Sequence, residues 1–153
     1  MRKTDETSGR DDPFDLRRFT SAQEDVYDGV LAELRGGKKR SHWMWYIFPQ
    51  IDGLGRSETA KHFSITGPEE ARAYLAHPVL GPRLVECTEL VLSIEGRSTL
   101  EIFGHTDDLK LKSSMTLFES VAEPGSVFAR VLDKCFHGER DVMTLRLMRL
   151  DHG

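Results

Sequence analysis

The chain has 153 residues, the length of one ordinary domain, which argues against a two-domain enzyme with an interdomain cleft. It carries 21 Lys and Arg against 25 Asp and Glu, and the net charge of −4 argues against a protein that covers nucleic-acid phosphates with its whole surface. Hydrophobic residues make up 39% and charged residues 30%, a balance that allows a core and differs from that of a disordered chain.

Targeting, membrane and metal signals are missing from the sequence. No apolar run approaches the roughly 20 residues that cross a bilayer, and residues 1–15 are charged, so we expect a cytoplasmic protein without membrane contact. Cys87 and Cys135 form no C-x-x-C motif, and the six histidines have no ligand spacing. The sequence therefore predicts two buried thiols, no metal and no cofactor.

Helical periodicity begins after an irregular first segment. Residues 1–13 show no apolar periodicity and predict a mobile leader, followed by one domain over residues 14–150. Apolar residues from Phe19 to Leu34 recur at helical spacing, and Gly36 marks the end of this first helix. Thr20 and Gln23 have the spacing of a capping box at its start.

Capping signals and apolar stripes predict more helices along the rest of the chain. They are a short helix opened by Thr66 and Glu69, a long one from Leu80 to Ile94, one opened by Ser98 and Glu101, one capped by Asp107 that runs to Val121, and two last ones over 128–136 and 141–148. Alternating strand patterns joined by tight turns are missing from the sequence. We therefore predict an all-α or nearly all-α single domain of about seven helices.

An aromatic segment over residues 41–50 departs from the amphipathic pattern. It holds both tryptophans, Trp43 and Trp45, together with a Tyr and a Phe. One interpretation is a buried hinge, because aromatic side chains bury large areas and Pro49 ends any helix there. The other is a cavity wall whose indoles stack a planar ligand while His42 and Gln50 supply hydrogen bonds.

A glycine turn follows directly. Gly53 and Gly55 precede Ser57, which can cap a short helix. One interpretation is a simple turn with a cap; the other is a set of backbone N–H groups that receive a phosphate or a carboxylate at a helix end. The spacing matches neither the dinucleotide fingerprint nor the P-loop motif.

The predicted helix after Asp107 carries two lysines in different settings. Lys112 lies opposite the apolar face and is explained as a solvated charge. Lys110 lies just off the apolar side, so we expect it to pair with Asp107 or Asp108 or to meet an anionic ligand.

Two further features leave alternatives open. Gln23 lies on the apolar side of the first helix, where its amide either braces a loop or binds a ligand. Residues 38–40 are basic and precede the aromatic segment, a combination that could bind single-stranded nucleic acid, although the acidic net charge makes nucleic acid a minor hypothesis.

These segments resemble the signature of a small helical family of bacterial and fungal proteins of unknown function, whose records often carry the label calpastatin. The resemblance covers Phe14 to Leu150 and rests on Ser41-His42-Trp43-Met44-Trp45 with Ile47-Phe48-Pro49-Gln50, and on Asp107-Asp108 with Lys110-Leu111 and Ser113. It implies a helical fold and no established activity. The label itself does not suit this chain, because an inhibitor of that kind is disordered whereas these helices are patterned and capped. A looser similarity in size and composition is to NADAR domains, which are associated with cleavage of N-glycosidic bonds in ADP-ribose-type compounds.

The hypothesis that follows is a pocket for a small planar anionic metabolite, nucleotide-like in character. The predicted ligand-binding residues are Gln23, His42, Trp43, Trp45, Gln50, Gly55, Ser57 and Ser113. If the site is that of an N-glycosidase-type hydrolase, Asp107 or Asp108 would activate water or stabilise an oxocarbenium-like centre, and Lys110 would hold phosphate. The alternative is a non-catalytic module that binds a protein or metabolite. An enclosed cavity near Lys110 would favour the enzyme, and a flat exposed patch of tryptophans would favour the module.

Overall fold

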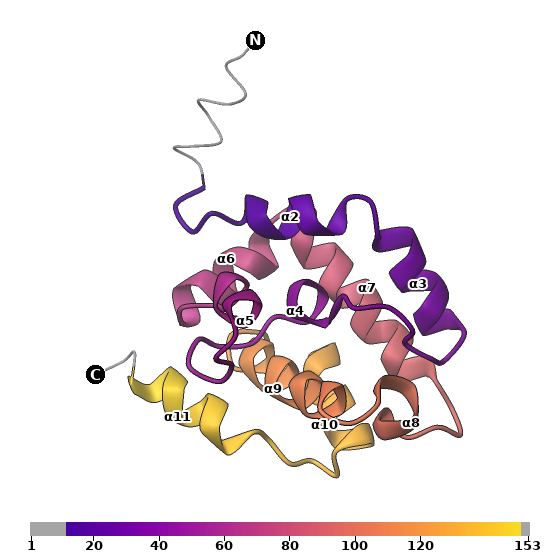
Figure 1. Ribbon diagram of the computed structural model, residues 1–153. Helices are drawn as coiled ribbons and strands as arrows, with labels where there is room; N and C mark the ends of the chain where they lie inside the picture. Colours follow the sequence, from indigo (N-terminus) through magenta and orange to yellow (C-terminus); the bar gives the residue numbers. More distant parts are fainter. Residues whose placement is uncertain (1–11, 151–153) are drawn as a thin grey trace.

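The computed structural model describes residues 12–150 and shows a helical domain with no strand in that range (Figure 1). Its ten helices are α2 (Arg17–Gln23), α3 (Tyr27–Arg35), α4 (Met44–Ile47), α5 (Glu58–His62), α6 (Pro68–Ala76), α7 (Leu80–Ser93), α8 (Thr99–Phe103), α9 (Asp107–Glu119), α10 (Val127–Cys135) and α11 (Val142–Leu150). The all-α prediction is confirmed, whereas the count of about seven is wrong. The excess arises because the first predicted helix is divided in two and because α4 and α5 are short separate helices of four and five residues.

Because the first predicted helix is divided in two, the polar residues at its start make other contacts than the sequence predicts. Helix α2 ends at Gln23, and a turn closed by the Val26 amide on the Gln23 carbonyl (3.1 Å) leads into α3. Thr20 lies inside α2, so it forms no capping box with Gln23, and that prediction is wrong. The carboxylate of Asp12 satisfies the start of α2 instead, accepting from the amides of Leu16 and Arg17 at 2.6 and 3.0 Å.

Two of the remaining predicted caps are confirmed. Ser98 and Glu101 form a capping box at α8, and the hydroxyl of Ser57 accepts from the Ala60 amide (3.1 Å) at α5.

Two other predicted caps are wrong. Thr66 pairs with Glu70 rather than Glu69, because α6 begins one residue later than predicted, at Pro68. Asp107 does not cap α9 either: it is the first residue of that helix, and its carboxylate faces lysines instead.

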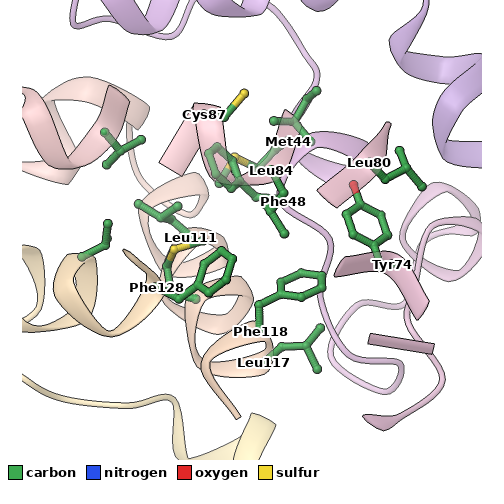
Figure 2. Packing of buried hydrophobic residues seen from close by; sticks show 14 of the residues in the cluster. Met44, Phe48, Tyr74, Leu80, Leu84, Cys87, Leu111, Leu117, Phe118 and Phe128 are labelled. Atoms are coloured by element: carbon green, nitrogen blue, oxygen red, sulfur yellow. The ribbon is translucent and has the colours of Figure 1, made fainter. Parts of the chain in front are cut away.

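Helix α9 runs through the middle of the domain and contacts α6, α8, α10 and α11 (Figure 1). Its buried face carries Phe118, which lies between Tyr74 of α6 and Phe128 of α10, with ring centroids 5.3 and 5.9 Å away (Figure 2). Burying a Phe side chain contributes about 1.5–3 kcal/mol. The core therefore fixes the position of α9, whose first turn carries Asp107 and Lys110.

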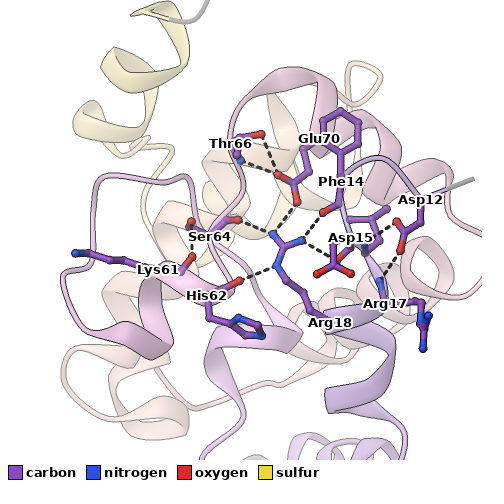
Figure 3. A network of polar contacts seen from close by, with 11 residues as sticks. Asp12, Phe14, Asp15, Arg17, Arg18, Lys61, His62, Ser64, Thr66 and Glu70 are labelled. Carbon is purple, nitrogen blue, oxygen red and sulfur yellow. Dashed lines mark hydrogen bonds and ion pairs between the residues drawn. The ribbon is translucent and has the colours of Figure 1, made fainter. Parts of the chain in front are cut away.

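The segment between α4 and α6, which contains α5, is held at both ends. Ile51 and Ile65 form an isolated parallel bridge, in which the Asp52 amide donates to the Ile65 carbonyl at 2.8 Å. Arg18 of α2 donates to the carbonyls of His62 and Ser64, each at 2.7 Å, and pairs with Glu70 at 2.8 Å (Figure 3). These contacts fix the glycine turn against the rest of the domain.

No helix of residues 12–150 is long and apolar enough to span a membrane. The leader predicted for residues 1–13 lies outside the described residues except for Asp12 and Pro13.

Candidate functional site

Two depressions lie on different sides of the aromatic segment. Trp43 and Tyr46 are three residues apart and share one side of the α4 turn, whereas Trp45 points elsewhere. The first depression, here named the Trp45 groove, has a volume of about 210 Å³ and is lined by Trp45, Gln50, Leu54, Gly55, Thr106, Leu109, Lys110 and Ser113. The second, here named the Glu33 hollow, has a volume of about 270 Å³ and is lined by Asp25, Val26, Gly29, Val30, Glu33, Ser41, His42, Trp43 and Tyr46.

The Trp45 groove brings together five residues that the sequence singled out in three separate segments. They are Trp45, Gln50, Gly55, Lys110 and Ser113. Sequence reasoning missed Leu54, Thr106 and Leu109, which also line the groove. The structure leaves Leu109 51% exposed. The only signal in the sequence was the position of this large apolar residue directly after the two aspartates.

Lys110 is the one charged residue among the described residues that line the groove. Its ammonium nitrogen is 4.1 Å from the centroid of the Trp45 ring and 3.1 Å from Oδ1 of Asp107. The other Asp107 oxygen is 2.9 Å from the ammonium of Lys39, which also lies over the Trp43 ring at 5.2 Å. Two lysines thus share one carboxylate, and the cluster keeps a net positive charge.

The same cluster decides the ionisation of Asp107. Burial acts to raise the pKa of this carboxyl, but the hydrogen bonds and charges of Lys39 and Lys110 outweigh it and lower the pKa below its ordinary value. Asp107 is therefore ionised at neutral pH. Its neighbour Asp108 has no lysine partner in the part of the chain that the structure describes, and its Oδ1 accepts from the Leu109 amide at 2.9 Å.

The wall at the start of α9 contains a strained residue. Thr106 has φ +71°, which is rare for a β-branched side chain, and its hydroxyl does not cap the helix. Strained backbone of this kind persists where the surrounding structure holds it, and it is concentrated at functional sites. In contrast, Ser113 has a structural role, since its hydroxyl donates to the Leu109 carbonyl at 3.2 Å.

The glycine turn contributes Gly55 but not Ser57. A Cβ on Gly55 would lie 2.5 Å from the Cβ of Ala60, so α5 packs too closely for any larger residue, and the same position is 3.7 Å from the Trp45 ring. Ser57 is used as the cap of α5 and does not line the groove.

The side chains of Gln23 and Trp43 are buried and make contacts within the protein. Gln23 is 1% exposed, and its amide donates to the Tyr46 carbonyl (2.7 Å) and the Tyr74 hydroxyl (3.3 Å) while its oxygen accepts from Arg83 (3.2 Å). Trp43 is 2% exposed. Both the bracing interpretation of Gln23 and the buried-hinge interpretation of Trp43 thus describe what the structure shows.

The Glu33 hollow contains His42 and Trp43, two predicted residues that the groove lacks, and a carboxylate that sequence reasoning missed. Glu33 Oε1 accepts from the Arg40 amide (2.8 Å), the Ser41 amide (3.1 Å) and the Trp43 indole (2.8 Å), and Oε2 accepts from the Ser41 hydroxyl (2.6 Å). Burial acts to raise the pKa of Glu33, but these four hydrogen bonds lower it to about 2. No motif relates Glu33 to the aromatic segment, so the sequence offers no signal for this contact.

Neither depression holds a metal-binding arrangement. Among residues 12–149, no group of three or more His, Cys, Asp or Glu side chains could hold a metal ion. The groove offers a lysine, an amide, hydroxyls and an indole, which suit an organic anion.

Comparisons with known proteins agree with the fold and give no activity. The family model described as "Protein of unknown function (DUF1810)" matches residues 13–148. A solved structure, the conserved hypothetical protein Rv1873 from Mycobacterium tuberculosis, is 53% identical with a TM-score of 0.89, and the match covers 90% of this chain and 99% of that one. No curated protein matches the chain. The predicted membership in a helical family of unknown function is confirmed, and neither matched description mentions calpastatin or NADAR.

Proposed function

Because the chain belongs to the DUF1810 family, whose description names no activity, we propose its function from the groove itself: the protein binds a small planar anionic metabolite, nucleotide-like in character, in the Trp45 groove. The observation that carries this proposal is the position of the Lys110 ammonium 4.1 Å from the Trp45 ring centroid. An aromatic face and a cation in one depression are the two features that a planar anion requires.

The groove residues divide into an apolar and a polar part. The half-buried Trp45 ring, which has the Lys110 ammonium over one face, forms with Leu54 and Leu109 an apolar wall against which a flat ring can lie. Lys110 has three N–H donors and uses one for Asp107, so it retains donors for a carboxylate or a phosphate. Gln50 adds an amide at the same depression.

The volume limits the size of the ligand. At about 210 Å³ the groove is smaller than the roughly 300–1,000 Å³ of pockets that enclose drug-sized molecules. A space of this size is closer to that of a mononucleotide than to that of a dinucleotide, which would extend far beyond it. A mononucleotide is therefore the better first candidate than NAD.

Hydrolysis of an N-glycosidic bond is the second candidate function, favoured by the carboxylate of Asp107 beside Lys110. An ionised Asp107 with a lowered pKa suits stabilisation of a developing positive charge better than removal of a proton from water. Asp108 would then be the base. Neither aspartate lines the groove, so we rank hydrolysis behind binding. The alternative of a non-catalytic module that binds a partner through a flat, exposed patch of tryptophans has less support, because Trp43 is buried.

Calorimetric titration with AMP tests the proposal. Lys110→Gln should weaken AMP binding by about tenfold or more, since a hydrogen bond to a charged group is lost. Lys112→Gln is the matched control, because Lys112 lies on the same helix but pairs with Glu139 at 3.2 Å, outside the groove. Adenosine, which lacks the phosphate, should bind the wild type as weakly as AMP binds Lys110→Gln.

Two results would overturn the binding proposal: no heat of binding with AMP, or equal affinities in Lys110→Gln and Lys112→Gln. Chromatography of the same mixtures tests hydrolysis separately. Release of free adenine from AMP by the wild type, but by neither Asp107→Asn nor Asp108→Asn, would support cleavage. AMP that binds and stays intact would assign binding alone.

A further inference from the structure

The three charges of the cluster beside the Trp45 groove do not balance. Lys39 and Lys110 pair with the two oxygens of Asp107, at 2.9 and 3.1 Å, and neither lysine forms another ion pair within residues 12–149. Two positive charges thus share one negative charge. We propose, in a step that rests on the function proposed above, that Lys39 and Asp107 are positioning residues that set the affinity of the groove for anions through Lys110.

The two lysines differ in exposure. The side chain of Lys39 is 8% exposed and does not line the groove, whereas that of Lys110 is 24% exposed and does. The backbone of Lys39 is fixed as well, because its amide donates to the Ile102 carbonyl at 2.8 Å. A cation buried to this extent needs a counter-charge, and among the described residues Asp107 supplies it. The unbalanced positive charge is therefore presented to the groove by Lys110.

The carboxylate of Asp107 acts against an anionic ligand. It accepts from the Lys110 ammonium, so it occupies one donor of that lysine and reduces the positive charge that an anion meets. Lys39 on the other oxygen opposes this effect, because its charge offsets that of the carboxylate. Without Lys39, Asp107 and Lys110 would form a neutral pair, and an anion would gain little from binding there.

This charge balance predicts opposite effects for the two residues, although neither lines the groove. Removing the charge of Asp107 should strengthen anion binding, and removing the charge of Lys39 should weaken it. A purely structural role predicts a different pattern. If Asp107 only tied the segment of Lys39 to the first turn of α9, either substitution would loosen the groove and weaken binding, and the two together would weaken it most.

Calorimetric titration of the whole protein with AMP, near neutral pH and at constant ionic strength, tests these signs. Lys39→Gln should raise the Kd of AMP about fivefold, and Asp107→Asn should lower it about fivefold. Asparagine retains an oxygen that can accept from a lysine, so the change is chiefly one of charge. The double variant Lys39→Gln with Asp107→Asn leaves Lys110 as the single charge of the cluster and should bind AMP about as tightly as the wild type.

Controls separate this effect from general charge and from loss of structure. Lys39→Arg keeps the charge and should keep most of the affinity. Lys38→Gln removes the same charge from the exposed neighbouring position and should leave the Kd unchanged. Adenosine, which lacks the phosphate, should bind all these variants equally. If Lys39→Gln does not fold, as judged by circular dichroism, Asp107→Asn still decides, because a gain in affinity cannot come from a loosened groove.

Three results would contradict the inference while leaving the proposed function intact: AMP binds Lys39→Gln as tightly as the wild type, Asp107→Asn binds AMP more weakly than the wild type, or the double variant binds AMP more weakly than Lys39→Gln. A wild type that does not bind AMP at all would overturn the proposed function, and this inference with it.

Discussion

The indole N–H of Trp43 donates a 2.8 Å hydrogen bond to Oε1 of Glu33, and this contact ties the aromatic segment to α3. It explains why two neighbouring tryptophans have different roles. Trp43 is held inside by Glu33 and by Lys39 over its ring, whereas Trp45 remains half-buried beside Lys110. The aromatic segment is thus both a buried hinge and the wall of a groove.

Glu33→Gln should destabilise the protein near neutral pH by about 1 kcal/mol, a small value because the carboxylate is not deeply buried. Hydrogen bonds lower the pKa of Glu33 from 4.5 to about 2. Its ionised form therefore stabilises the fold above pH 4.5, and this contribution is lost as the pH falls toward 2. Urea unfolding of wild type and variant over this pH range should give curves that converge at the acid end.

Glu24→Gln is the control, because Glu24 is exposed and makes the same charge change. A difference between wild type and Glu33→Gln that stays constant down to pH 2 would contradict the hydrogen-bond explanation of the low pKa.

Arg18→Met should destabilise the protein by about 3 kcal/mol, because it leaves the Glu70 carboxylate buried without its cation. It also removes the donors that hold the carbonyls of His62 and Ser64 (Figure 3). Arg17→Met removes the same charge from the neighbouring exposed position and should cost little. Urea unfolding of the two variants measures the difference, and equal midpoints would show that the network does not hold the loop.

The sequence predicts the helical class of this fold because apolar periodicity and local caps are short-range signals. Ser57 and the Ser98–Glu101 box are correct, since each depends on residues three apart. Thr20 and Gln23 have the same spacing but fail, because α2 begins earlier, at Arg17, and the Gln23 amide finds partners on Tyr46 and Tyr74 far along the chain. A tertiary hydrogen bond of this kind competes with the local cap and has no pattern in the sequence.

The candidate site also combines residues that the sequence predicts with tertiary contacts that it does not. Trp45 and Lys110 stand out in the sequence by composition and by position on a helix, and the structure places them in contact. Their relation to Thr106 could not be predicted, because its positive φ depends on how α8 and α9 are packed. Glu33 was missed for a similar reason: an exposed face of an amphipathic helix gives no sign that four donors from the next segment will converge on one of its carboxylates.

Asp107→Asn should destabilise the protein by about 1–2 kcal/mol, because Lys39 and Lys110 lose the carboxylate that they share. The pKa of Asp107 is lowered, so its contribution is present above the ordinary value of 3.8 and is lost as the pH falls below it. Asp108→Asn is the matched control, since it also removes a carboxylate from the first turn of α9 but leaves both lysine contacts intact. Denaturant unfolding near neutral pH and again in acid measures both effects. Equal losses in the two variants would assign the effect to the helix dipole rather than to the lysines.

Gly81→Ala should destabilise the protein far more than Gly29→Ala, which changes the other glycine within a helix of the described residues. A Cβ on Gly81 would lie 2.1 Å from the Leu75 carbonyl oxygen, and a backbone atom cannot move aside without shifting α6 against α7. Overpacking of this kind costs about 1–3 kcal/mol or more, which lowers Tm by several degrees in a domain of this size. Gly29→Ala is the comparison, because its Cβ meets nothing within 4 Å and alanine favours the helix by about 0.5–1 kcal/mol. Thermal unfolding followed by circular dichroism should therefore move in opposite directions for the two variants, and a Gly81→Ala protein as stable as the wild type would show that α6 and α7 do not approach this closely.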